Sequence, residues 1–122
     1  TFLELAGAPI PADIQGESLL PLLKGERPEN WRNSLYYHYY EYPAEHSVKR
    51  HYGVRDDRYK LIHFYNDIDV WELYDLQEDP HEMNNLYGKP SYEAVMKRMR
   101  DELYKLQKQY DDPVGIRFNV SD

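Results

Sequence analysis

Cysteine is absent from this 122-residue chain, and its absence excludes several classes of chemistry. Without thiols the chain can form no disulfide, no thiolate zinc site and no cysteine nucleophile. Long apolar runs are missing as well, since no stretch approaches the roughly 20 residues that a transmembrane helix needs. Basic residues are scarce, with 15 Lys and Arg against 22 Asp and Glu, so general binding to nucleic-acid phosphates is disfavoured.

An initiator Met and a signal peptide are also lacking, and the chain opens inside a helical pattern at Thr1, which predicts a piece of a longer protein. Its length allows one domain, or a domain with short extra segments. Hydrophobic residues make up 41% and charged residues 30%, a balance typical of globular proteins rather than of disordered ones. Tyrosine is the most conspicuous residue type, with 13 positions.

Four short segments rich in aromatic and β-branched residues are separated by turn-forming residues, which predicts strands. These segments are Leu35–Tyr42, Tyr52–Arg55, Arg58–Tyr65 and Val70–Leu76. Their short connections favour an antiparallel meander, with a hairpin at Asp56-Asp57, where Arg55 and Arg58 are predicted to form ion pairs. The aromatic residues of the first segment fall on both sides of a strand, so both faces of the sheet are predicted to be covered.

A helix is predicted from Ser91, as N-cap, to Tyr110. Its apolar residues recur every three or four positions and form a one-sided stripe: Tyr92, Val95, Met96, Met99, Leu103, Leu106 and Tyr110. Such a helix packs across one face of a sheet. The predicted fold class is therefore α+β, a four-stranded antiparallel sheet packed by a C-terminal amphipathic helix, with an N-terminal helical and extended connecting segment. Residues 113–122 show no clear pattern.

The N-terminal segment holds more apolar residues than it can bury on itself. A helix end is predicted before Gly7, and a short helix is predicted after Ser18, with Pro21 in its first turn and Gly25 at its end. The leucines and isoleucines of this segment need a partner surface.

Several segments, taken in order and spacing, resemble the C-terminal end of a type I sulfatase, a formylglycine-dependent family of the alkaline-phosphatase-like superfamily. They are Thr1-Phe-Leu-Glu-Leu-Ala-Gly with Gln15-Gly-Glu-Ser-Leu-Leu-Pro-Leu-Leu, Gly53-Val-Arg with Arg58-Tyr-Lys-Leu-Ile, and Trp71-Glu-Leu-Tyr-Asp-Leu with Asp79-Pro-His-Glu-Met-Asn-Asn-Leu. The resemblance is greatest to bacterial glycan sulfatases. It implies a connecting segment from the end of a catalytic domain at residues 1–27, the C-terminal subdomain at 28–112 and a tail at 113–122.

In that family the chemistry belongs to a large N-terminal domain, which holds calcium and a formylglycine made from a Cys/Ser-x-Pro-x-Arg motif. No serine of this chain begins such a motif. The resemblance therefore implies that the parent protein is a sulfuric ester hydrolase and that this chain alone is inactive. It implies the catalytic domain and a sulfated carbohydrate as partners, no nucleic acid or membrane partner, and a periplasmic or secreted location.

The loop from Glu45 to His51 resembles a substrate-facing loop of sulfatases that act on sulfated glucosamine or related glycans. A sulfated sugar offers hydroxyl and anionic groups, which suit histidine and cationic donors. His51, at the junction of loop and strand, is the first candidate for substrate binding, followed by Arg50 and His46. The chain itself is predicted to hold no metal and no catalytic residue.

Two alternatives stay open at this point. One is an independent module that binds an acidic sugar or another anion through the same three residues, and the other is a purely structural cap. A solvated loop is the simplest alternative for His46 and Lys49. His38 and His63, which fall within tyrosine-rich strands, are interpreted as structural.

Overall fold

The computed structural model describes residues 1–119 and divides into two compact units, Thr1–Arg32 and Asn33–Asp122. Unit 1 contains two single-turn helices, α1 (Phe2–Leu5) and α2 (Leu20–Leu23). Gly7 and Gly25 follow them with φ of 65° and 80°, so both predicted helix ends are confirmed. The N-cap of α2 is Leu19 and not Ser18, although the Ser18 Oγ accepts a hydrogen bond from the Leu20 N–H at 3.2 Å.

Unit 1 has no buried residue, although it is rich in leucine and isoleucine. Phe2 is 88% exposed and Leu23 is 70% exposed. Two turns of helix cannot enclose side chains of this size, so the unit has helical ends but no core. The assignment of residues 1–27 to the end of a catalytic domain stays a prediction.

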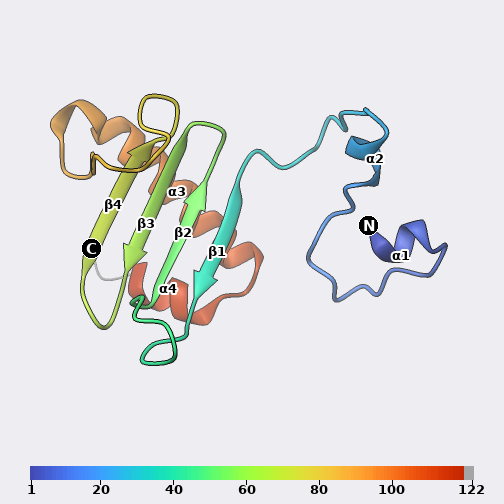
Figure 1. Cartoon of the computed structure of the whole chain (residues 1–122), viewed down its shortest axis with the longest axis horizontal. Coiled ribbons are helices and arrows are strands. Elements are labelled where there is room, and N and C mark those ends of the chain that lie inside the picture. Colours follow the sequence, from blue (N-terminus) through green and yellow to red (C-terminus); the bar gives the residue numbers. More distant parts are fainter. Residues whose placement is uncertain (120–122) are drawn as a thin grey trace. The chain divides into compact units, whose positions relative to one another are not determined.

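Unit 2 is built on one antiparallel sheet with strand order β1-β2-β3-β4 (Figure 1), which confirms the predicted meander. The strands are β1 (Leu35–Tyr39), β2 (His51–Arg55), β3 (Tyr59–Phe64) and β4 (Val70–Asp75). β1 is shorter than predicted. Tyr39 pairs with His51, the first residue of β2, and the chain then turns so that the Tyr42 N–H donates to the Tyr40 carbonyl at 2.9 Å. Tyr40 to Tyr42 therefore have no strand to pair with.

Three helical segments follow the sheet: η1 (Pro90–Tyr92), α3 (Glu93–Gln109) and α4 (Pro113–Asn119). Ser91 was the wrong choice for the N-cap, since it lies inside the 3₁₀ turn that Pro90 begins, and the residue before α3 is Tyr92. α4 lies in the segment for which the sequence shows no pattern. Residues 120–122 of that predicted tail lie outside the described residues.

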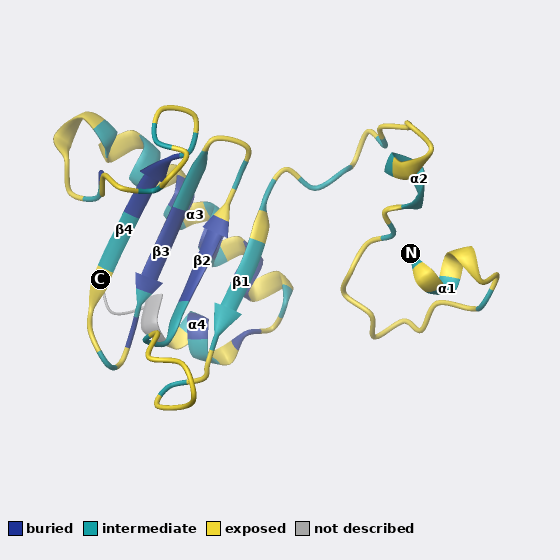
Figure 2. Ribbon diagram, in the orientation of Figure 1, coloured by how far each residue is buried: buried dark blue, intermediate teal, exposed yellow. Residues whose placement is uncertain are grey.

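The hydrophobic core lies between α3 and one face of the sheet (Figure 2). Side chains of the central strands and of α3 have no exposed surface there: Tyr52, Val54, Leu61, Leu73, Met99 and Leu103. The predicted stripe of α3 is thereby confirmed as the packing face. Within unit 2 the helices cover this face alone, and no helix lies in front of the other face in Figure 1. Gly53, Ile62 and Tyr74 of that other face are nevertheless buried. The coverage of both faces stays a prediction.

A buried polar cluster joins β1 to the start of α4. The His38 side chain is 3% exposed; its Nδ1 lies 2.5 Å from Asp112 Oδ2 and its Nε2 lies 2.5 Å from the Tyr65 hydroxyl. Tyr36 donates its hydroxyl hydrogen bond to the same carboxylate. Asp112 Oδ1 also accepts the backbone N–H groups of residues 114 and 115, which caps α4.

Burial alone would raise the pKa of Asp112. The hydrogen bonds from Tyr36, from the backbone and from His38 outweigh burial, so the pKa lies below its ordinary value. His63 is held in a similar way, with Nδ1 2.6 Å from the Tyr52 hydroxyl and Nε2 2.8 Å from Asp69. The structural interpretation of both strand histidines fits this geometry.

The β2–β3 hairpin is fixed by contacts other than the predicted ones. Asp56 accepts the N–H groups of Arg58 at 2.8 Å and Tyr59 at 2.6 Å, and its carboxylate pairs with Arg98 of α3 at 2.7 Å. The Arg58 side chain instead reaches Asp75 at the end of β4, at 2.7 Å. Hydrogen bonds from the Arg58 guanidinium hold the pKa of buried Asp75 below its usual range.

Candidate functional site

Tyr42 anchors the loop between β1 and β2, which carries the predicted substrate-binding residues. The Arg50 Nε donates to the Tyr42 carbonyl at 2.8 Å, and Arg50 Nη2 donates to the same oxygen. The Lys49 ammonium lies 3.8 Å from the centre of the Tyr42 ring and donates to its hydroxyl. Two adjacent cations therefore close the loop on one tyrosine, through its carbonyl, its ring and its hydroxyl.

Arg50 also links this loop to the turn between β3 and β4. Its backbone carbonyl accepts the Tyr65 N–H at 3.3 Å, and its Nε lies 3.9 Å from the Asp67 carboxylate. The loop and the turn lie at the same end of the sheet, because Tyr39, His51, Phe64 and Val70 pair across its four strands. Arg50 thus holds together the two connections at this end.

His51 is held as the sequence predicts, at the junction of loop and strand. Its ring lies between Tyr39, with ring centres 5.4 Å apart, and Phe64, with ring centres 5.0 Å apart. His51 Nδ1 donates to the Lys49 carbonyl at 2.8 Å, which assigns the proton of the neutral ring to that nitrogen. His51 Nε2 then carries a lone pair and has no hydrogen-bond partner among residues 1–119.

A histidine in this setting has a fixed ring plane and one nitrogen free to accept a hydrogen bond when neutral. After protonation the same nitrogen becomes a charge-bearing donor. A sugar hydroxyl suits the first state, and a sulfate oxygen suits the second. The geometry therefore favours His51 over the other candidates as a group that contacts a ligand.

The structure gives the three predicted residues different settings. His51 and Arg50 lie next to each other at the sheet end, whereas His46 lies on the exposed part of the loop and makes no hydrogen bond or ion pair with described residues. Sequence reasoning missed Tyr42, which both cations contact. The signal available for it was the Tyr42-Pro43 pair, whose peptide bond is cis.

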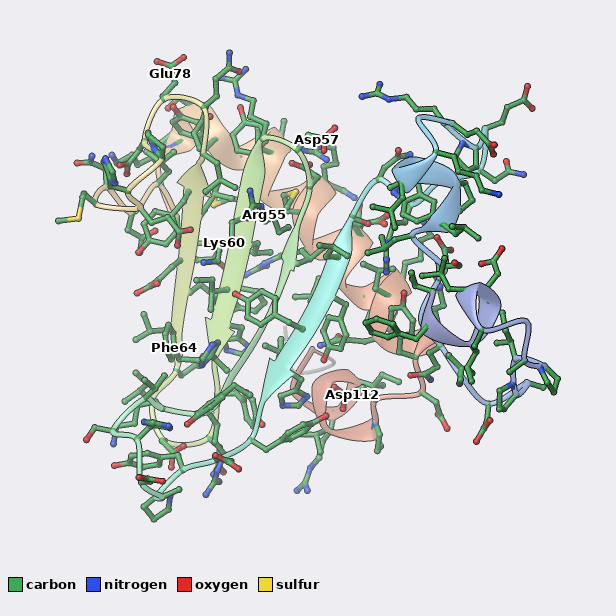
Figure 3. All side chains as sticks on the ribbon, turned by 45° about the vertical axis from the view of Figure 1, so that its right-hand side comes forward. Arg55, Asp57, Lys60, Phe64, Glu78 and Asp112 are labelled. Carbon is green, nitrogen blue, oxygen red and sulfur yellow. The ribbon has the colours of Figure 1, made fainter. Side chains whose placement is uncertain are left out.

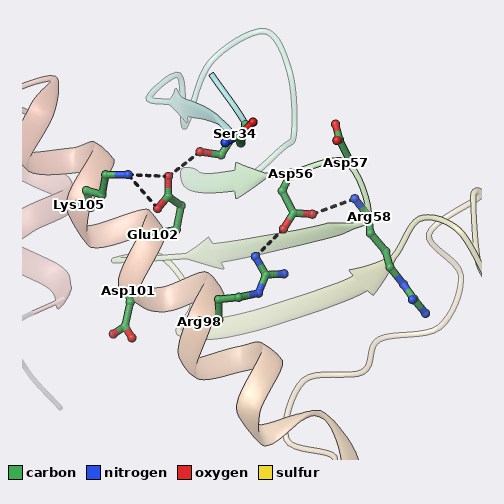
Figure 4. Close-up of a pocket in the computed structure, with 9 residues that line it drawn as sticks. Ser34, Asp56, Asp57, Arg58, Arg98, Asp101, Glu102 and Lys105 are labelled. Atoms are coloured by element: carbon green, nitrogen blue, oxygen red, sulfur yellow. Dashed lines mark hydrogen bonds and ion pairs between the residues drawn. The ribbon is translucent and has the colours of Figure 1, made fainter. Parts of the chain in front are cut away.

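A second candidate region is the charged pocket between the β2–β3 hairpin, the residues before β1 and α3 (Figure 4). Two of its acidic residues have partners near the helix: Ser34 Oγ donates to Glu102 at 2.6 Å, Lys105 pairs with Glu102 at 3.2 Å, and Asp101 pairs with Lys97 at 2.7 Å. The Ser34–Glu102 and Asp56–Arg98 contacts tie the segment before β1 and the hairpin to α3, and the other two pairs lie within α3. The pocket is accordingly a structural charge network.

No three His, Asp or Glu side chains within residues 1–119 gather where they could share a metal ion. None of the helices in that range is long and apolar enough to cross a membrane.

Comparisons with known proteins agree with this arrangement. N-acetylglucosamine-6-O-sulfatase of Bacteroides thetaiotaomicron is 59% identical over 114 residues, which are 92% of this chain and 20% of that protein. Delta 4,5-hexuronate-2-O-sulfatase of the same species is 36% identical over 102 residues, 82% of this chain and 20% of that protein. The chain thus spans about a fifth of the length of these curated relatives.

A similar solved structure is that of a protein in complex with its substrate D-glucosamine-2-N,6-O-disulfate. It has a TM-score of 0.88 and 57% identity, and the match covers 93% of this chain and 23% of that one. A family model described as N-sulphoglucosamine sulphohydrolase, C-terminal, matches residues 1–109. The chain with the four-stranded sheet, the packed helix and the tyrosine-anchored loop therefore belongs to the C-terminal domain family of the N-sulphoglucosamine sulphohydrolase type, within the sulfatases.

Proposed function

We propose that this chain is the C-terminal subdomain of a sulfatase that hydrolyses sulfate esters on glycans, and that its substrate class is 6-O-sulfated glucosamine. The observation that carries the proposal is the 59% identity, over 92% of the chain, to an N-acetylglucosamine-6-O-sulfatase. The solved relative at 57% identity has a substrate that bears a 6-O-sulfate on glucosamine as well.

The chain's own part in this reaction is to cap and shape the substrate pocket. Formylglycine and calcium would be held by the catalytic domain, since the chain contains no Cys/Ser-x-Pro-x-Arg motif and its described residues contain no metal-binding cluster. The proposed partners are that catalytic domain and the sulfated glycan. The proposed location of the parent, periplasmic or secreted, fits an extracellular glycan substrate.

Within the chain, the loop anchored on Tyr42 provides the sugar contacts. His51 offers its Nε2 to a hydroxyl or sulfate oxygen, from a ring that stacking holds in place. Arg50 contributes mainly by holding the loop against the β3–β4 turn, since its Nε and Nη2 donate to the Tyr42 carbonyl. His46, on the exposed part of the loop, contacts more distant parts of a longer glycan.

The test is a substrate panel on the full-length parent protein. Purified parent is incubated with N-acetylglucosamine 6-O-sulfate, N-sulfoglucosamine and a 2-O-sulfated unsaturated hexuronate disaccharide, and released sulfate is quantified. The control replaces the Cys or Ser of the parent's formylglycine motif by Ala. We expect release from the 6-O-sulfate that the control abolishes, and release from the N-sulfate or the 2-O-sulfate alone would contradict the proposal.

A further inference from the structure

Three buried polar groups connect α4 to the loop between β1 and β2: the Asp112 carboxylate, the His38 imidazole and the Tyr65 hydroxyl. Asp112 Oδ2 lies 2.5 Å from His38 Nδ1, and His38 Nε2 lies 2.5 Å from the Tyr65 oxygen. We propose that this polar triad positions the loop for substrate, so that its three members are positioning residues for substrate binding. The inference rests on the proposed function.

The polar triad lies at the end of the sheet that carries the loop. Asp112 lies toward the same end as Phe64, away from the β2–β3 hairpin (Figure 3), and Phe64 pairs with His51. His38 lies on the covered face of the sheet, which packs against α3, and His51 lies with Tyr39 on the opposite, open face. The triad therefore supports the loop from the covered face.

Each hydrogen bond of the triad has a definite donor. Burial raises the pKa of Asp112, but its hydrogen bonds outweigh burial, so the pKa lies below its ordinary value and the ionised carboxylate only accepts. His38 Nδ1 consequently donates to Asp112. Burial raises the pKa of Tyr65, so its hydroxyl keeps its proton and donates to Nε2 of the neutral His38 ring. Both nitrogens are used, and the plane of the ring is fixed.

Tyr65 links the triad to the two connections at this end of the sheet. Its backbone N–H donates to the Arg50 carbonyl at 3.3 Å, and its carbonyl accepts the Asp67 N–H at 2.7 Å. Arg50 in turn donates through Nε to the Tyr42 carbonyl at 2.8 Å. A shift of the Tyr65 side chain therefore moves the backbone that holds Arg50, and Arg50 anchors the loop.

A second contact runs from His38 to the start of the loop. The His38 ring stacks on Tyr40 with ring centres 4.0 Å apart, and the Tyr40 carbonyl accepts the Tyr42 N–H at 2.9 Å. Tyr42 contacts Lys49 through its ring and its hydroxyl. The Lys49 carbonyl accepts the His51 Nδ1 hydrogen bond at 2.8 Å. Both routes from His38 thus meet at Tyr42 and lead to the candidate substrate-binding histidine.

At the other end of the triad, α4 is fitted closely to the covered face. Asp112 Oδ1 accepts the N–H groups of Val114 at 3.0 Å and Gly115 at 3.1 Å. A Cβ on Gly115 would lie 3.0 Å from the Tyr36 hydroxyl and 2.7 Å from Cδ of Gln107, which is fully buried. α4 lies this close because residue 115 has no side chain. The position of α4 therefore sets the position of the Asp112 carboxylate.

Burial alone does not require polar groups at this place. The adjoining core consists of fully buried apolar side chains such as Leu61, Leu73 and Leu103. A buried polar network costs desolvation free energy, and apolar side chains of similar volume are often as stable or more stable. Hydrogen bonds add direction, because each donor must face its acceptor. The polar triad is therefore suited to orienting the loop, which apolar packing would leave less defined.

The first test compares two hydroxyl deletions in the full-length parent protein. Tyr65→Phe removes the link between His38 and the loop, whereas Tyr52→Phe removes a buried hydroxyl that bonds to His63 at 2.6 Å. Each variant keeps its ring, so packing is matched. We expect Tyr65→Phe alone to raise KM for N-acetylglucosamine 6-O-sulfate, by about three- to tenfold with kcat unchanged. Unchanged KM for Tyr65→Phe, or the same increase for Tyr52→Phe, would overturn the proposal.

The second test asks whether α4 and the loop are coupled through His38. Asp112→Asn, Tyr65→Phe and the double variant are made in the same parent, and KM is measured for each. Residues that act through one shared group have non-additive effects. We expect Asp112→Asn to raise KM as well, and the double variant to raise KM by less than the product of the two single effects. An increase equal to that product or larger would contradict the proposal.

Hydrogen exchange separates this inference from the proposed function, because it needs no catalysis. In the parent, Tyr65→Phe should speed amide exchange at residues 44–50 by about three- to tenfold relative to Tyr52→Phe. Faster loop exchange in a parent that releases no 6-O-sulfate would retain the positioning of the loop and refute the proposed function. Sulfate release by a parent whose loop exchanges equally in both variants would do the reverse.

Discussion

The two faces of the sheet are made by alternate residues of the same strands, yet they differ in packing and in hydrogen bonding. On the covered face Tyr52, Leu61 and Leu103 have no exposed surface, and the Tyr52 hydroxyl bonds to His63. On the open face Tyr39 is half-buried and its hydroxyl has no partner within the described residues. The first face therefore holds the hydrophobic core of the unit, and the second leaves a buried hydroxyl unpaired within the described residues.

The largest effect is expected from a cavity on the covered face. Leu103→Ala removes a fully buried side chain between α3 and the sheet, so the free energy of unfolding should fall by roughly 2–5 kcal/mol. Urea denaturation of the 122-residue chain measures it. A loss below about 1 kcal/mol would show that this face is packed no better than the open one.

The next largest loss of stability is expected when the charge of Asp112, which caps α4, is removed. Asp112→Asn weakens the hydrogen bonds with His38 and Tyr36, and at pH 7 it should cost about 2 kcal/mol of unfolding free energy. The folded-state pKa of Asp112 lies below its ordinary value of 3.8, so this stability is present above that value and is lost as pH falls through the folded pKa.

Denaturation at a series of pH values checks this prediction. The difference between wild type and Asp112→Asn should shrink below about pH 4, where the carboxylate takes up a proton. A difference that stays constant down to pH 2 would show that the charge of Asp112 contributes nothing to stability.

A pair of hydroxyl deletions sharpens the contrast between the faces. Tyr52→Phe removes the partner of buried His63 Nδ1 and should lower the unfolding free energy by about 1–2 kcal/mol. Tyr39→Phe removes a buried hydroxyl that has no partner within the described residues, so the unfolding free energy should stay unchanged or rise by up to about 1 kcal/mol. Equal losses for the two variants of the chain would erase the distinction between a satisfied face and an incomplete one.

The smallest effect is expected on the outer surface of α3. Lys97→Ala breaks an ion pair with Asp101 whose side chains are 77% and 66% exposed. Solvent screens such a pair, so the unfolding free energy should change by no more than about 0.5 kcal/mol. A larger loss would mean that this surface contributes to packing.

The strands and α3 could be predicted from the sequence, because the spacing of apolar residues and the positions of turn-forming residues depend only on nearby residues. α4 was missed because its seven residues are too few to show a periodic apolar stripe, although Asp112 and Pro113 are typical of a helix start. The sequence also did not decide what the loop cations Lys49 and Arg50 contact. Arg50 was predicted to bind substrate, and a solvated position was the alternative given for Lys49. Both side chains instead contact Tyr42, and no local sequence pattern predicts that contact.

His51 gives the most direct test of the claim that the loop anchored on Tyr42 contacts the substrate. In the full-length parent, kcat/KM on N-acetylglucosamine 6-O-sulfate is measured for His51→Ala and for His81→Ala, which alters an exposed histidine at the opposite end of the sheet. Loss of one hydrogen bond to a charged or polar sugar group predicts a roughly 10- to 100-fold decrease for His51→Ala alone. Wild-type kcat/KM for His51→Ala, or equal losses for both variants, would contradict the account.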